Sequence, residues 1–194
     1  MASLTNLLGE VRSCNVCIAH LPAGPRPIVQ MDTTASIVII GQAPGRRVHE
    51  SGVPWDDPSG VRLRAWLDLT PEQFYDPTKV AILPMGFCYP GSAKSGDLPP
   101  RPECAPLWHD PLLDHLPRER LEVIIGVYAQ KRYIVEPGKN LTATVSNWKS
   151  YLPHQIVMPH PSPRNQAWFT KNPWFEEEVI PAVQTRVRQV VATD

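Results

Sequence analysis

The sequence of 194 residues lacks a net charge, a long apolar run and a recognisable leader segment. Lysine plus arginine number 19, as do aspartate plus glutamate, so the overall charge favours no nucleic-acid partner and any cationic face must come from local clustering. No apolar run approaches the roughly 20 residues of a membrane-spanning helix. Residues 1–6 lack the charged and apolar regions of a signal peptide. We therefore expect a cytoplasmic protein with no membrane span.

Two common nucleotide-binding motifs are also absent. The loop after the first apolar run carries Gly41, Gly45 and Gly52, which allow a backbone to approach a ligand closely. It matches neither GxGxxG nor GxxxxGK[ST]. The sequence therefore argues against a dinucleotide site or a kinase-type phosphate loop.

Proline is frequent, with 23 residues against 11 glycines. This content lies below the level typical of disorder and indicates long, stiffened loops. The hydrophobic fraction of 42% and the chain length suit one complete core. We expect a single domain over residues 1–194 and a monomer.

Four short runs rich in β-branched residues predict a parallel sheet. They cover residues 36–40, 80–83, 123–125 and 155–157, and each is almost continuously apolar, as in strands buried on both faces. Helices are predicted at residues 4–11, 59–67, 107–116 and 129–135, followed by a C-terminal helix with Pro181 in its first turn or at a kink. The predicted fold is α/β, a three-layer α/β/α sandwich with a central four-stranded parallel sheet.

The loop after the last predicted strand holds three chemically useful side chains. Prolines at 159, 161 and 163 prevent helix or central strand here and stiffen the backbone around His160, Ser162 and Arg164. A stiff loop at the carboxyl end of a parallel strand is a common place for a ligand site, and a histidine there can donate to developing negative charge. A proline-rich turn with a capping histidine is the structural alternative.

Four cysteines are spaced as a close pair and two distant single residues: Cys14, Cys17, Cys88 and Cys104. Four thiolates can share one metal centre only if the fold brings the N-terminal pair beside the segment 88–104. Four small buried apolar residues are the alternative, because free cysteine is often buried. Ligand type alone does not separate zinc from an iron-sulfur cluster.

Together these motifs resemble those of the uracil-DNA glycosylase superfamily, and within it the iron-sulfur bacterial and archaeal branches, families 4 and 5. Residues 41–45 (GQAPG) resemble the first motif, Gly52-x-Pro54-Trp55 resembles the segment whose aromatic ring stacks on uracil, and residues 160–165 (HPSPRN) resemble the last motif. The last motif is also similar to that of the single-strand-selective monofunctional branch. The resemblance runs the length of the chain.

The resemblance implies a monofunctional hydrolase that flips uracil, and other deaminated bases, out of DNA and cleaves the N-glycosidic bond. It implies base contacts from Gly41, Gln42, Ala43, Trp55, Gly86 and Phe87. It implies DNA contacts from Gly45, Arg46, Ser162, Arg164 and Asn165. It also implies a 4Fe-4S cluster on the four cysteines, with zinc or no metal as the alternatives, and makes His160 the donor to uracil O2.

The general base departs from the family pattern. Members carry an aspartate or a glutamate in the first motif, where this chain has Ala43 and Gln42, and a neutral amide cannot activate water. Another branch carries its catalytic aspartate in a later D-x-S-G segment, which residues 57–60 resemble. Asp57 is therefore the predicted catalytic carboxylate. The spacing from the aromatic residue is one residue short, which leaves Asp56 and His49 as substitutes.

Base recognition departs from the pattern as well. Many members place an asparagine in the loop after the second strand, whereas residues 84–89 offer no side-chain amide. Backbone groups of residues 85–87 would then read the base with less discrimination, so a tolerant pocket for uracil and also hypoxanthine or xanthine is expected. Two other readings stay open: a DNA-binding member of the fold without chemistry, and a cysteine-rich redox or metal-transfer protein.

Overall fold

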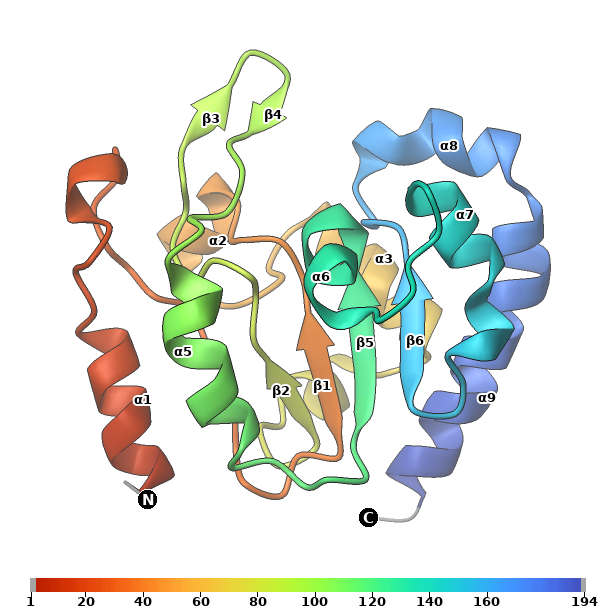
Figure 1. Cartoon of the computed structure of the whole chain (residues 1–194), viewed down its shortest axis with the longest axis horizontal. Helices are drawn as coiled ribbons and strands as arrows, with labels where there is room; N and C mark the ends of the chain where they lie inside the picture. The colour runs from red at the N-terminus through yellow and green to blue at the C-terminus, as the bar shows by residue number, and fades with distance from the viewer. Residues whose placement is uncertain (1–2, 193–194) are drawn as a thin grey trace.

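Four parallel strands form the central sheet of the computed structural model, which describes residues 3–192. Their order across the sheet is β2-β1-β5-β6 (Figure 1). The strands are β1 (Ile37–Ile40), β2 (Val80–Ile82), β5 (Leu121–Ile125) and β6 (Gln155–Met158). All four predicted strands are confirmed, because continuous apolar runs are what a sheet covered on both faces requires.

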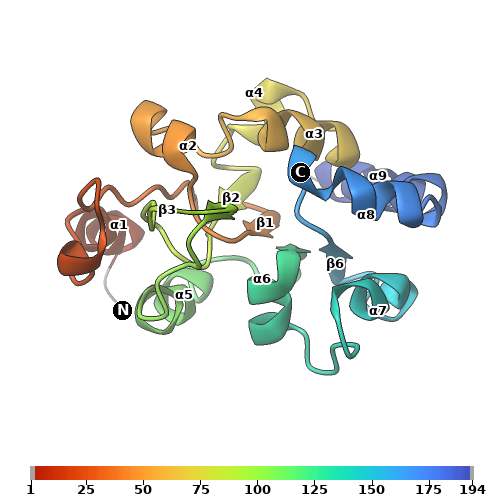
Figure 2. The same ribbon diagram turned by 90° about the horizontal axis from the view of Figure 1, so that it is seen from above.

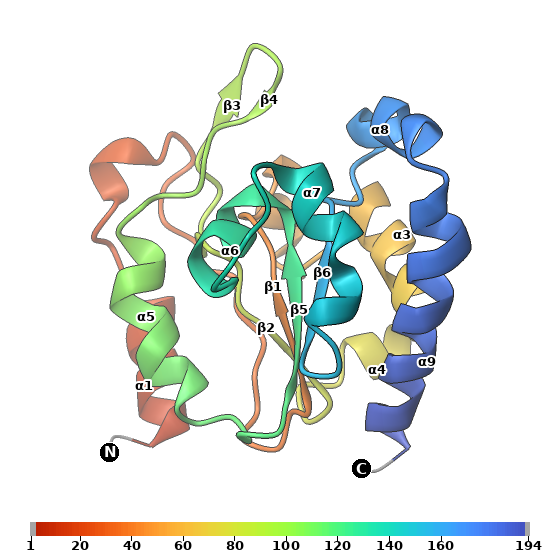
Figure 3. The ribbon, with the colours of Figure 1, turned by 45° about the vertical axis from the view of Figure 1, so that its right-hand side comes forward.

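Helices cover both faces of the sheet and make three layers (Figures 2 and 3). One face carries α1 (Leu4–Arg12), α5 (Cys104–Leu113), α6 (Gly126–Tyr133) and α7 (Leu141–Ser146). The other carries α3 (Pro58–Leu67), α4 (Pro71–Phe74) and α9 (Ile180–Val191). The short helices α2 (Arg46–Ser51) and α8 (Gln166–Lys171) lie near the edge at which the strands end. The predicted α/β fold is therefore confirmed.

Two helices begin earlier than the sequence pattern predicts. Helix α5 begins at Cys104 because Pro106 falls in its first turn, where a missing N–H breaks no helical hydrogen bond. Helix α6 begins directly after β5 at Gly126, whose φ of 79° lets the chain turn from strand to helix without a loop. In the C-terminal helix, Pro181 occupies the first turn as expected.

A hairpin and several short turns that the sequence pattern does not predict complete the structure of the described residues. A two-stranded hairpin, β3 (Ser92–Ala93) and β4 (Gly96–Asp97), projects beyond the carboxyl edge of the sheet (Figure 1). A π-helical turn at Phe175–Val179 precedes α9. Short 3-10 turns lie at Ile18–His20, Trp148–Ser150 and Pro163–Asn165.

The core lies between the sheet and its two helical layers. Strands β1 and β2 are buried along their whole length. An aromatic cluster supports the chain after β6: Trp66 of α3 contacts Phe169 and Phe175 edge-on, with ring centroids 5.4 and 5.0 Å away. No helix within residues 3–192 is both long and apolar enough to cross a membrane.

Two buried polar side chains hold backbone carbonyls at the carboxyl edge of the sheet. His109 of α5 is fully buried, and its Nε2 lies 3.0 Å from the carbonyl oxygen of Pro84, just after β2. Gln130 of α6 donates from Nε2 to the carbonyl oxygen of Met158, the last residue of β6, over 3.0 Å. Each gives a buried backbone acceptor a hydrogen-bond partner.

The buried imidazole of His109 predicts a loss of stability in mild acid. Burial lowers its pKa from 6.5 to about 4, so the unfolded chain binds a proton in this window that the folded chain does not. The free energy of unfolding should be constant above pH 6.5 on this account and should fall by about 3 kcal/mol as the pH drops to 4. Urea unfolding at a series of pH values measures it.

The variant His109→Gln keeps a donor for the Pro84 carbonyl and removes the titrating ring, so its stability should depend less steeply on pH. His154→Gln, which removes an exposed imidazole, is the matched control. If the free energy of unfolding of His109→Gln falls with pH as steeply as that of the parent protein, His109 is not the group responsible.

Candidate active site

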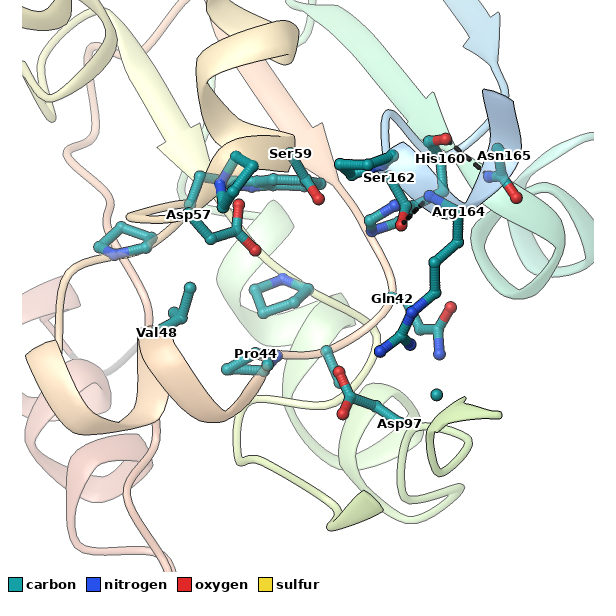
Figure 4. A pocket seen from close by; sticks show the side chains of 18 of the residues that line it. Gln42, Pro44, Val48, Asp57, Ser59, Asp97, His160, Ser162, Arg164 and Asn165 are labelled. Carbon is teal, nitrogen blue, oxygen red and sulfur yellow. Dashed lines mark hydrogen bonds between the residues drawn. The ribbon is translucent and has the colours of Figure 1, made fainter. Parts of the chain in front are cut away.

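A pocket of about 530 Å³ opens at the carboxyl edge of the sheet, a volume typical of small-molecule sites. Its walls come from the loop after β1, the segment between α2 and α3, the β3–β4 hairpin and the loop after β6 (Figure 4). The polar lining residues are Gln42, Asp57, Ser59, Ser95, Asp97, His160, Ser162, Arg164 and Asn165.

Most of the residues predicted for a site meet in this pocket. Those that line it are Gln42, Ala43, Gly45, Trp55, Asp57, His160, Ser162, Arg164 and Asn165. Gly41, Arg46, Gly86 and Phe87 do not line it. Gly41 lies buried beneath the indole of Trp55, and Arg46 is exposed at the start of α2.

Trp55 is held in an unfavourable backbone conformation by close packing. Its φ of 57° lies in the left-handed region, which a bulky residue adopts only where its surroundings require it. A Cβ on Gly41 would lie 2.8 Å from its ring, and a Cβ on Gly60 would lie 1.8 Å from its carbonyl oxygen. Both glycines are therefore necessary for this placement. Arg64 adds a long hydrogen bond of 3.5 Å to the same carbonyl oxygen.

Asp57 caps helix α3 with one carboxylate oxygen, and its carboxylate also lines the pocket. It is the N-cap of α3, where its Oδ1 accepts a hydrogen bond of 2.8 Å from the backbone N–H of Gly60. Its carboxylate also faces the pocket (Figure 4). The two substitutes lie elsewhere: Asp56 is close enough to Tyr75 to affect its pKa, and the ring of His49 lies 5.9 Å from that of Tyr89. Neither lines the pocket.

His160 faces Trp55 and Asp57 in the pocket. Its ring centroid lies 5.5 Å from that of Trp55, and the side chain of Asn165 donates a hydrogen bond of 2.8 Å to its backbone carbonyl. Burial lowers the pKa of His160, and the nearby negative charge of Asp57 opposes that change. Burial therefore favours the neutral imidazole, which can donate one N–H.

The mouth of the pocket carries a cation and a carboxylate from opposite sides (Figure 4). The guanidinium of Arg164 lies so close to the hairpin that a Cβ on Gly96 would be 2.7 Å from its Nη1. Asp97 of the same hairpin faces Gly45, whose Cβ would lie 3.3 Å from Oδ2. Sequence reasoning missed Asp97, because the segment 94–97 carries no signal beyond that of a hairpin turn.

The loop after β2 supports the pocket more than it lines it. Of residues 84–87, Pro84 lines the pocket, whereas Gly86 and Phe87 line a separate cavity beside the cysteines. The backbone N–H of Met85 donates to the carbonyl of Gly41, that of Gly86 to the carbonyl of Gln42, and that of Phe87 to Cys104 Sγ. The donors that were expected to read a base here are therefore already bonded within the protein.

Residues 28–184 match the Uracil DNA glycosylase superfamily. The chain belongs to this superfamily. Its members are typically hydrolases of N-glycosidic bonds, which indicates a DNA glycosylase with DNA as its partner. The match includes the loops after β1, β2, β5 and β6, so it covers every segment that builds the pocket.

This glycosylase-superfamily chain brings its four cysteines to one place. Cys14, Cys17, Cys88 and Cys104 line one small apolar cavity on the α5 side of the sheet. Burial raises the pKa of Cys88 to about 11 and that of Cys104 to about 12. Across the described residues, 3–192, no group of three or more Cys, His, Asp or Glu side chains is arranged to hold a single metal ion.

The packing of Trp55 on Gly41 predicts a sharp difference between two glycine substitutions. Gly41→Ala places a methyl group against the indole, so it should displace the ring and lower the free energy of unfolding by about 1–3 kcal/mol. The indole N–H signal of Trp55 and urea unfolding measure both effects. Gly9→Ala is the control: a Cβ there meets no atom within 4 Å, and in a helix it should stabilise by about 0.5–1 kcal/mol. An unmoved indole signal in Gly41→Ala would show that the contact is loose.

Proposed function

We propose that this protein removes uracil from DNA by hydrolysis and leaves an abasic site, as a member of the iron-sulfur branches of its superfamily. One observation carries the proposal. Asp57 and His160 come from loops on different strands, yet they line one pocket and are close enough for the charge of Asp57 to affect the pKa of His160. A site that breaks an N-glycosidic bond needs this separation of roles, one group for the leaving base and one for the sugar and water.

The leaving base is the first requirement of the reaction. When the C1′–N1 bond breaks, its electron pair goes to the base, and negative charge develops on uracil O2. A neutral imidazole in a poorly solvated site can donate an N–H to that oxygen without adding a proton. His160 has this state because burial disfavours its cationic form. The side chain of Asn165 holds its backbone and keeps the donor in place.

The sugar and the water are the second requirement. The deoxyribose gains positive charge at C1′, and water must attack this carbon on the face opposite the departing base. The carboxylate of Asp57 stabilises that charge and accepts the proton of the attacking water. Because one oxygen of Asp57 is bonded to the backbone of Gly60, the other is held in a fixed direction.

The shape of the pocket suits a flat base. The indole of Trp55 lines it together with the apolar side chains of Ile82 and Pro84. One polar lining side chain of the first motif, Gln42, is an amide that can match more than one pattern of donors and acceptors. This supports acceptance of hypoxanthine or xanthine in addition to uracil.

The pocket mouth suits a DNA backbone. Arg46 lies exposed at the start of α2, and Arg164 and Ser162 lie at the loop after β6. Together with the backbone of Gly45 they would bind the phosphates next to an extruded nucleotide, and the Arg164 side chain would fill the gap in the base stack. Extrusion costs a few kcal/mol, and less for a mismatched uracil.

A 4Fe-4S cluster on Cys14, Cys17, Cys88 and Cys104 is part of the proposal. The donor set supports it, since four thiols from three distant segments line one cavity. A single zinc ion on the same four thiols is the alternative. A bound cluster would supply a crosslink between the end of α1, the loop after β2 and the start of α5, and no acid–base group.

Two substitutions test the catalytic roles. His160→Ala should slow single-turnover excision of uracil by about 10²–10³, the usual effect of losing one donor to an oxyanion. Asp57→Asn should slow it by about 10²–10⁴, because asparagine still caps α3 but cannot accept the proton. Quantifying abasic sites in single-stranded and duplex uracil DNA measures both.

Asp56→Asn and His49→Gln are the matched controls and should change the rate by less than about threefold. A fully active Asp57→Asn with an inactive Asp56→Asn or His49→Gln would move the base to that residue. A parent protein that binds uracil DNA and releases no uracil would establish the alternative of a DNA-binding member without chemistry.

The cluster has a test that does not depend on activity. Protein purified without air should be brown and contain four irons and four sulfides per chain, and Cys104→Ser should lose the colour and unfold at a lower temperature. One zinc and no colour would assign the site to zinc. If the purified protein contains no metal and Cys104→Ser unfolds at the same temperature as the parent protein, the four cysteines act only as small apolar residues.

A further inference from the structure

We propose that His109, with Tyr133, is a positioning residue that fixes the loop after β2 and thereby sets which bases the pocket accepts. The inference rests on the proposed function, because it concerns the same pocket. His109 lies on α5 and Tyr133 on α6, and neither lines the pocket.

The hydrogen bonds of His109 fix its tautomer. The Pro84 carbonyl oxygen, 3.0 Å from Nε2, can only accept, so Nε2 carries the proton. The other nitrogen, Nδ1, is then an acceptor, and it receives the hydroxyl proton of Tyr133. Arg132 Nε also donates to the Tyr133 oxygen, over 3.4 Å. Tyr133 thus selects the form of His109 that donates to the loop.

The same ring also packs against the loop. It stacks on the rings of Phe87 and Tyr133, with ring centroids 5.6 and 5.9 Å away and interplanar angles of 16° and 24°. The backbone N–H of Phe87 donates over 3.3 Å to Sγ of Cys104, the first residue of the helix that carries His109. Helix α5 therefore holds the loop at two points, Pro84 and Phe87.

Backbone hydrogen bonds hold the loop on both sides of Pro84. Toward β1, the amides of Met85 and Gly86 donate to the carbonyls of Gly41 and Gln42, and on the other side the amide of Ile28 donates to the carbonyl of Phe87. His109 bonds the carbonyl of Pro84, which lies between these points. Pro84 lines the pocket and has no N–H to add. A shift of Pro84 therefore moves the pocket floor and, through Gly41 and Gln42, the wall that carries the first motif.

The consequence is a residue that affects base choice without touching the base. A loosened floor changes the fit of a purine and of a pyrimidine by different amounts, since the larger ring reaches further into the pocket. A general loss of stability, in contrast, lowers the fraction of active protein and slows both by the same factor.

Tyr133→Phe tests the inference by removing one hydroxyl. The rate of uracil excision should fall about 5- to 10-fold, the size of one lost buried hydrogen bond, and the ratio of the uracil to the hypoxanthine rate should change by at least threefold. Nitrogen-15 NMR of His109 should show partial loss of the Nε2–H tautomer. Tyr151→Phe is the matched control: it also loses one hydroxyl hydrogen bond, to the carbonyl of Glu136, at the opposite edge of the sheet.

If Tyr133→Phe lowers the rates of uracil and hypoxanthine excision equally, so that their ratio is unchanged, the proposal is overturned. A parent protein that excises neither base would refute the proposed function instead. In that case the backbone amide NMR signals of Met85, Gly86 and Phe87 test whether His109 and Tyr133 fix the loop. A shift of these signals in Tyr133→Phe but not in Tyr151→Phe supports the proposal, and unchanged signals overturn it.

Discussion

The candidate site depends on the packing of Trp55 between two glycines. Gly41 directly follows β1 and Gly60 lies in the first turn of α3, so Trp55, which contacts both, sets the distance between the first motif and the helix that Asp57 caps. The left-handed backbone of Trp55 costs free energy that close contact with both glycines offsets. A side chain at either glycine would separate the two walls of the pocket. The aromatic face and the carboxylate are therefore placed by one contact.

This contact explains how Asp57 can serve two purposes. An N-cap aspartate is usually a structural residue, and its hydrogen bond to Gly60 is of that kind. The cap leaves one oxygen unbonded, and the turn at Trp55 directs the carboxylate into the pocket opposite His160 (Figure 4). In the proposed mechanism, Asp57 supplies from a neighbouring loop the carboxylate that Gln42 and Ala43 lack. A capping role and a catalytic role do not exclude one another here.

The sequence predicts the elements whose signal is local and misses those that depend on distant partners. Continuous β-branched runs predict all four strands, and the motifs place His160 and Asp57 at the ends of predicted elements. The hairpin that carries Asp97 has no such pattern, since a two-residue strand offers too few positions for a period. Nor does sequence reveal His109, whose partners Pro84 and Tyr133 are about 25 residues away on either side and become neighbours only after folding.

The buried side chains of His109 and Gln130 support the two outer strands of the sheet at its carboxyl edge. One bonds the carbonyl of Pro84, two residues beyond β2, and the other bonds the carbonyl of Met158, the last residue of β6. His109 and Gln130 satisfy these two carbonyls from the same helical layer. An apolar residue at either position would leave a buried acceptor unpaired and free to move toward water. The geometry of the pocket therefore depends on how α5 and α6 pack against the sheet. Helix α5 carries both Cys104, its first residue, and His109, which bonds the pocket-lining Pro84.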